Sequence, residues 1–130
     1  LLHKHVAQLD AGYGEDLSLK VCSVIRASLL AGDASAHHVA SRLGLSPRTL
    51  RRRLSEQQTS FAALVDETRF EVTCYLLEHS TASLTQIADL LGYAHSSALS
   101  RAFRRWAGLS PREWRAQRAR LGQREISATH

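Results

Sequence analysis

The 130-residue sequence contains no methionine and only two cysteines and two prolines. Two cysteines, Cys22 and Cys74, are too few for the disulfide framework of a small secreted domain, so we expect a reducing compartment, the cytoplasm. No apolar run approaches the roughly 20 residues of a membrane span, and no secretory signal opens the chain, so we expect no membrane partner. Because position 1 is not methionine, we expect a piece of a longer protein, with residues 1–16 as a connector from an upstream domain.

Lysine is scarce as well, since 15 of the 17 cationic side chains are arginine. Arginine suits planar, bidentate recognition of phosphate or guanine, although a GC-rich coding bias enriches it too. The formal net charge of +5 is unevenly spread, with −1 on residues 1–36 and +6 on residues 37–130. The 44% hydrophobic fraction excludes a disordered tail, and the length fits one domain or two very small ones.

Alternation typical of strands is missing, and apolar residues instead recur at helical spacing. Pro47 and Pro111 each follow a serine, which can cap a helix, and proline fits the first helical position. We therefore predict an all-α fold with helices over residues 17–31, 35–43, 47–57, 60–78, 84–91, 96–107 and 111–120. From residue 123 onward we expect a frayed tail.

A seven-residue pattern occurs twice, at residues 39–45 and 87–93, with an offset of 48. Both copies have a β-branched apolar residue, alanine, leucine and glycine at matching positions. The alanine lets the next helix cross closely, and Gly44 and Gly92 permit the left-handed backbone that a short turn requires. A basic helix follows each copy, so the sequence predicts two helix-turn-helix motifs.

The two second helices differ in the side chains that they project. In the first, Arg48, Arg51 and Arg52 lie on or near one face, opposite Leu50 and Leu54. Residues near a helix N-terminus are the ones that meet base edges in the major groove, and arginine to guanine is the commonest specific contact. Four arginines in eight residues repel one another unless an anion is bound, so a purely solvated face is the less favoured interpretation.

The second of these helices offers small hydroxyl groups at Ser96 and Ser97 and one cation near its start, Arg101. Serine reads either base type weakly. Leu99 and Phe103 are expected to pack inward. The first motif should therefore carry more of the affinity and of the guanine recognition than the second.

The chain resembles the AraC/XylS-type transcription regulators over residues 18–118. The residues that match the C-terminal signature of that family are Gly92-Tyr93, Ser97, Leu99, Ser100, Arg101, Phe103, Gly108, Ser110-Pro111, Trp114 and Arg115. Upstream matches are Val39-Ala40, Leu43-Gly44, Ser46-Pro47-Arg48-Thr49-Leu50, Ser60-Phe61, Arg69 and Leu76-Leu77. Tyr93, Leu99, Thr73 and Trp114 depart from the usual residues only as packing variants.

The resemblance implies two homeodomain-like helix-turn-helix subdomains, residues 17–59 and 79–121, joined by a linker helix over residues 60–78, with a tail at 122–130. Both recognition helices would enter successive major-groove segments on one face of a duplex. Nineteen helical residues span about 28 Å, which approaches the roughly 34 Å of one DNA turn. The implied base readers are Arg48, Arg51, Arg52, Ser96, Ser97 and Arg101. The implied phosphate contacts are Ser46, Arg53, His95, Arg104 and Arg105.

The implied partner is double-stranded DNA, with RNA polymerase as a candidate second partner. We expect this chain to be monomeric, and effector sensing and dimerisation to belong to an upstream domain. We expect no catalytic residue, no cofactor and no metal. The adjacent His37 and His38 point about 100° apart on a helix, with no third ligand at suitable spacing, and are interpreted as surface histidines.

Two other functions are compatible with parts of the sequence. A DNA-repair alkyltransferase can carry the same double helix-turn-helix, but it needs a nucleophilic, metal-bound cysteine cluster, which these residues do not contain. A basic protein-interaction module could use the cationic face for an acidic partner. Salt-dependent, sequence-selective DNA binding separates these from the leading hypothesis.

Several remaining residues have a structural interpretation. Cys74 is expected to be a core residue near the apolar side of the linker helix. Trp106 and Trp114 are expected to be core residues that dock the last helix. Arg69 is expected to form a structural ion pair with a nearby glutamate. The cations of the last helix could either touch the DNA backbone or face solvent: Arg112, Arg115, Arg118 and Arg120.

Overall fold

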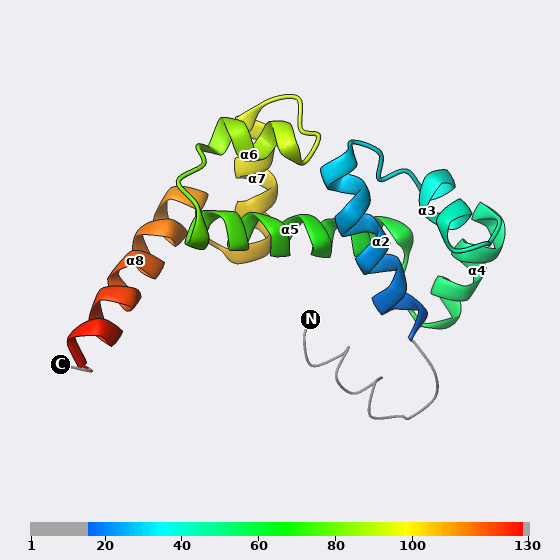
Figure 1. Ribbon diagram of the computed structural model, residues 1–130, viewed down its shortest axis with the longest axis horizontal. Helices are drawn as coiled ribbons and strands as arrows, with labels where there is room; N and C mark the ends of the chain where they lie inside the picture. Colours follow the sequence, from blue (N-terminus) through cyan, green and yellow to red (C-terminus); the bar gives the residue numbers. More distant parts are fainter. Residues whose placement is uncertain (1–15, 129–130) are drawn as a thin grey trace. The chain divides into compact units, whose positions relative to one another are not determined.

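The computed structural model describes residues 16–128, with side chains up to residue 123, so nearly all of the expected connector lies outside the described residues. This part of the chain holds seven α-helices and no strand (Figure 1). The predicted all-α fold is confirmed. The chain divides into two compact units, of which the first ends at Arg69 and the second begins at Phe70.

The first unit contains α2 (Leu17–Ala31), α3 (Ala36–Arg42), α4 (Pro47–Glu56) and the first part of α5 (Phe61–His79). A side-chain oxygen caps the start of α2, α3 and α4, because Asp16, Ser35 and Ser46 each accept a backbone N–H from the first turn. The core of this unit is aliphatic. Its most deeply buried apolar side chains are Val21, Ile25, Val39, Ala40, Leu50, Leu54 and Leu64.

The turn between α3 and α4 has a glycine in the left-handed region, since Gly44 has φ +71°. The N–H of Leu45 donates to the carbonyl of Ala40 at 2.9 Å, which closes the end of α3 in the manner of a Schellman motif. Glycine fits because a side chain in this conformation would be strained. The turn predicted from the sequence is therefore present.

The second unit contains the rest of α5, followed by α6 (Leu84–Leu90), α7 (Ser96–Ala107) and α8 (Pro111–Ala128). Helices α6 and α7 pack against each other (Figure 1). Their turn repeats that of the first unit, because Gly92 has φ +82° and the N–H of Tyr93 donates to the carbonyl of Ala88 at 2.9 Å. The predicted repeat is thus confirmed at the level of single hydrogen bonds.

The core of the second unit adds aromatic rings to its aliphatic side chains, whereas that of the first is aliphatic. Phe103 is fully buried, with its ring centroid 5.4 Å from that of Phe70 and 6.1 Å from that of Trp114. The half-buried Trp106 meets Phe70 edge-on at 5.7 Å. The predicted docking role is confirmed for Trp114, which joins α8 to Phe103 of α7, whereas the ring contact of Trp106 is with α5 and the part played by Phe70 was not predicted.

The last helix is longer than predicted. Helix α8 continues to Ala128, so the predicted helix end at residue 120 is wrong. The predicted frayed tail from residue 123 is wrong for residues 123–128. Gly122, which suggests an end in the sequence, lies inside the helix. The flanking Gln, Arg and Glu residues have high helix propensity and outweigh the cost of one glycine, about 1 kcal/mol.

Candidate nucleic-acid interface

Helix α4 presents a cationic face to solvent. Arg48, Arg51 and Arg52 are exposed and lie three and four residues apart, so they share one side of the helix. Leu50 and Leu54, on the opposite side, are fully buried in the first unit. The three predicted base readers of this helix are thus brought together on an accessible surface, and Arg53, a predicted phosphate contact, is exposed beside them.

Two groups of this face have partners within the chain. The guanidinium of Arg52 lies 3.6 Å from the carboxylate of Glu56, one turn further along α4. The hydroxyl of Ser46 accepts the N–H of Thr49 and donates to the Thr49 hydroxyl at 3.0 Å. Any phosphate contact by Ser46 therefore shares a hydroxyl that already caps the helix. The cap by Ser46 was predicted from the sequence, whereas the pairing of Arg52 with Glu56 was not.

Helix α7 presents a less cationic face. Ser97 and Arg101 are exposed one turn apart, and Ser96 is half-buried. The opposite side is anchored in the core by Leu99 and Phe103, neither of which has exposed surface. The predicted base readers of this helix therefore also gather near its N-terminus, with Ser96 the least accessible of them.

The two recognition helices differ at their first residue. Ser46 caps α4 with its side chain, whereas exposed His95 occupies the same position before α7 and makes no capping hydrogen bond. Imidazole lacks the short-tethered oxygen that the best capping residues provide. The first amides of α7 consequently have no side-chain acceptor, which keeps them open to an anion at this end of the helix.

The last turn of α7 carries two of the predicted phosphate contacts, Arg104 and Arg105, and both are exposed. Arg104 forms an ion pair within the chain, because its Nη2 lies 3.6 Å from Oε1 of Glu113 at the start of α8. Glu113 also forms a capping box with Ser110, in which each residue accepts the backbone N–H of the other. The hydrogen bonds from Ser110, together with the nearby Arg104, hold the pKa of Glu113 below its ordinary value.

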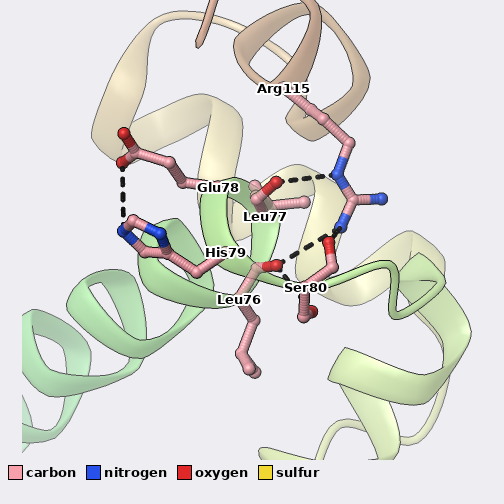
Figure 2. A network of polar contacts seen from close by, with 6 residues as sticks. All are labelled: Leu76, Leu77, Glu78, His79, Ser80 and Arg115. Carbon is pink, nitrogen blue, oxygen red and sulfur yellow. Dashed lines mark hydrogen bonds and ion pairs between the residues drawn. The ribbon is translucent and has the colours of Figure 1, made fainter. Parts of the chain in front are cut away.

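The cations of α8 split into different roles, which the sequence left open. Arg115 reaches the end of α5 and donates a hydrogen bond to the carbonyl of Leu77 there (Figure 2), and another to the carbonyl of Ala82 in the loop that follows. The guanidinium of Arg118 lies 4.7 Å from the centroid of the Trp114 ring, in a cation–π contact. Arg112 and Arg120 are exposed. A contact between residues nearly 40 positions apart leaves no local signal, so the role of Arg115 could not be found from the sequence.

The cysteine and histidine candidates lie in surroundings that explain them without a reactive or metal site. Burial raises the pKa of the Cys74 thiol to about 11, so the reactive thiolate is scarce at neutral pH. Nδ1 of His38 lies 3.7 Å from a carboxylate oxygen of Asp33. Across residues 16–128 no helix is both long and apolar enough to cross a membrane.

Comparison with known proteins shows which proteins this chain is similar to. A family model described as a helix-turn-helix domain matches residues 39–117. The regulator VirS of Mycobacterium tuberculosis is 40% identical over 100 residues, which are 77% of this chain and 29% of VirS. The regulator GadX of Escherichia coli K12 is 30% identical over 115 residues, which are 88% of this chain and 42% of GadX. The chain thus spans less than half the length of these relatives.

Among the solved structures that resemble the chain, one contains nucleic acid. The DNA-binding domain of the global transcriptional factor AdpA, solved with a target DNA, has a TM-score of 0.66 and 30% identity. The match covers 84% of this chain and 99% of that domain. With the family model matching more than half of the residues, the chain belongs to the AraC-type helix-turn-helix family of transcription regulators, as a DNA-binding domain.

Proposed function

We propose that this chain reads a specific sequence of double-stranded DNA by inserting α4 and α7 into successive major-groove segments of one duplex. The observation that carries the proposal is the face of α4. Arg48, Arg51 and Arg52 are exposed together there, and within the described part of the chain no carboxylate pairs with the first two. Uncompensated guanidinium groups on one helix face favour an anionic partner, and guanine offers arginine a bidentate acceptor pair.

The side chains divide into two groups by their expected contacts. The base readers lie in the first two turns of each recognition helix, and all but the half-buried Ser96 are exposed: Arg48, Arg51, Arg52, Ser96, Ser97 and Arg101. Phosphate contacts come from residues at the helix starts and on the flanks: Ser46, Arg53, His95, Arg104 and Arg105. The open N-terminus of α7 supports His95 in this group, because a phosphate can accept amides that no side chain caps.

For the whole protein, the proposal is a transcription regulator without enzymatic activity that acts in the cytoplasm, where it meets DNA. We expect this chain alone to bind as a monomer, since its two helix-turn-helix motifs suit an asymmetric site. Three functions of the whole protein stay predictions: dimerisation through another domain, effector sensing through that domain, and contact with RNA polymerase.

The experiment that tests the proposal starts with selection of bound duplexes from a random pool. The selected duplex and a scrambled duplex of equal composition are then titrated over a range of salt concentrations. Six to ten phosphate contacts predict a slope of log affinity against log salt of roughly −5 to −9. A flat slope with no preference between the two duplexes contradicts the proposal and favours an acidic protein as the partner.

A further inference from the structure

The end of α5 exposes backbone carbonyls that the helix itself does not satisfy. The last carbonyls of any α-helix lack donors within the helix. Here the N–H and the hydroxyl of Ser80 both donate to the carbonyl of Leu76, at 3.1 and 2.7 Å. The carbonyl of Leu77, and those of the loop 80–83 that leads into α6, need donors from elsewhere in the fold.

Arg115, in the second turn of α8, supplies those donors from a half-buried position. Its Nε donates to the carbonyl of Leu77 at 2.9 Å, and its Nη2 donates to that of Ala82 at the same distance. The same Nη2 lies 3.3 Å from the carbonyl of Ser80 and 3.4 Å from that of Leu76. Figure 2 shows the guanidinium against the final turn of α5.

The chemistry of these contacts is specific to arginine. A guanidinium presents five N–H donors in a planar fork, so one group can hold carbonyls from the helix end and from the loop at once. A lysine ammonium is a compact point donor and cannot copy that geometry. The positive charge also interacts favourably with the C-terminal dipole of α5.

The loop that Arg115 holds determines where α6 begins. Ser83, at the end of the loop, caps α6 through a capping box with Gln86. Helix α6 packs in turn on α7, with Ile87 and Ala88 buried. A change in the loop is therefore passed to the whole helix-turn-helix of the second unit.

We propose that Arg115 is a positioning residue for DNA recognition: its guanidinium fixes the loop 80–83 on the end of α5 and so orients α6 and α7. The inference rests on the proposed function, because its consequence is the correct presentation of α7 to the second half of the DNA site. Arg115 does not itself contact DNA in this scheme, because its Nε and Nη2 already bind backbone carbonyls.

The first test is free of DNA and compares Arg115→Met, Arg115→Lys and the control Arg112→Met. Arg112 lies one turn earlier on α8, is exposed, and its replacement makes the same change in charge. Amide hydrogen exchange in residues 80–86 should rise about tenfold in Arg115→Met, since charge-assisted bonds to the loop are lost. Exchange should rise less in Arg115→Lys and stay unchanged in Arg112→Met, and residues 47–56 should be unaffected in every variant. Unchanged exchange at 80–86 in Arg115→Met overturns the proposal.

The second test uses two duplexes, the full selected site and one with the half read by α7 scrambled. On the full site, Arg115→Met should bind about tenfold more weakly than the wild type. On the half-scrambled duplex, the variant and the wild type should bind with equal affinity. Equal loss on both duplexes, or Arg115→Lys matching the wild type in both tests, overturns the inference. If the wild type itself does not prefer the full site, the proposed function fails while the exchange result still decides the role of the loop contact.

A variant that does not fold is recognised by circular dichroism. If Arg115→Met loses its helical signal, Arg115→Lys, which keeps the charge and part of the hydrogen bonding, takes its place in both tests. The expected changes are then about threefold, in the same segment and on the same duplex. The absence of both changes contradicts the proposal.

Discussion

The two helix-turn-helix units share one turn but differ in the faces that they expose. Leu45 to Ala40 and Tyr93 to Ala88 are the same hydrogen bond at the same length, 48 residues apart. Outward from that turn, α4 carries a row of arginines behind a serine cap, whereas α7 carries serines and one early arginine behind an uncapped start. A repeated scaffold therefore constrains the turn and the inward residues and leaves the outward residues free to specialise.

The cores differ as well, and this gives the largest expected effect. Phe103 is fully buried between Phe70 and Trp114, so Phe103→Ala should lower the free energy of unfolding by about 3–5 kcal/mol. Both tryptophans of the chain lie in the second unit, so their fluorescence during urea unfolding reports on that unit. Leu90→Ala, at a partly exposed position of α6, is the control and should change stability by about 0.5 kcal/mol or less. Similar losses for both variants would contradict the packing described for the second unit.

The next prediction addresses the affinity carried by each unit. Arg51→Ala should cost about 1–3 kcal/mol on the selected duplex and relax the base preference at one or two positions. Arg101→Ala should cost less, because α7 has fewer cations near its N-terminus. Binding titrations against a panel of single-base variants measure both effects. A larger loss for Arg101→Ala would reverse the assignment of the first unit as the stronger reader.

The different helix starts give a third prediction in two opposite directions. His95→Ser should raise the free energy of unfolding by about 1 kcal/mol by adding a cap, and Ser46→Ala should lower it by about the same amount. Thermal unfolding measures both changes. If His95→Ser gives no gain in stability, the uncapped start of α7 is not a weak point of the fold.

The smallest expected effect concerns the pairing of Arg104 with Glu113. Arg104→Ala should weaken binding to all duplexes about equally, as expected for a phosphate contact. Glu113→Gln removes the competing carboxylate but keeps the capping box, since glutamine can take the same role, and should tighten binding about twofold on every duplex. A gain confined to the selected duplex would show that Arg104 reads bases instead.

The same variant has a pH dependence of defined sign. The pKa of Glu113 is lowered chiefly by hydrogen bonds from Ser110, so the carboxylate stabilises the fold when it is ionised. The stabilisation relative to Glu113→Gln is complete above the ordinary pKa of 4.5 and is lost as the pH falls through the lower value of the folded state. Melting temperatures of the two proteins should therefore converge as the pH drops below 4.5, and a difference that is constant with pH would contradict this linkage.

Most of the fold was predictable because the chain marks its own helix boundaries. Serine caps, two prolines and the glycines at the turns place the ends of α2 to α7 within one or two residues of those predicted. The end of α8 was not predictable, because Gly122 suggests a helix end and few apolar residues follow it to continue the periodicity. The helix propensity of its glutamine, arginine and glutamate residues favours that continuation, and a search for apolar periodicity does not detect it.

The candidate site was predictable in part for a similar reason. Leu50, Leu54, Leu99 and Phe103 reveal which side of each recognition helix faces inward, and the exposed sides follow. Two contacts depend on neighbours that only the folded chain brings together: the ion pair of Arg104 with Glu113 and the hydrogen bonds from Arg115 to the end of α5. No sequence spacing carries that information.

The composition of α4 and α7 has a consequence for how their charge can be altered. Both α4 and α7 contain arginine and no lysine, and the only lysines of the sequence are Lys4 and Lys20. A guanidinium does not lose its proton in the physiological range, and it offers no amine for acetylation. Neither ordinary shifts in acidity nor lysine acylation can neutralise these guanidinium groups, so their positive charge persists under both, and added salt is the variable that weakens their attraction for polyanions.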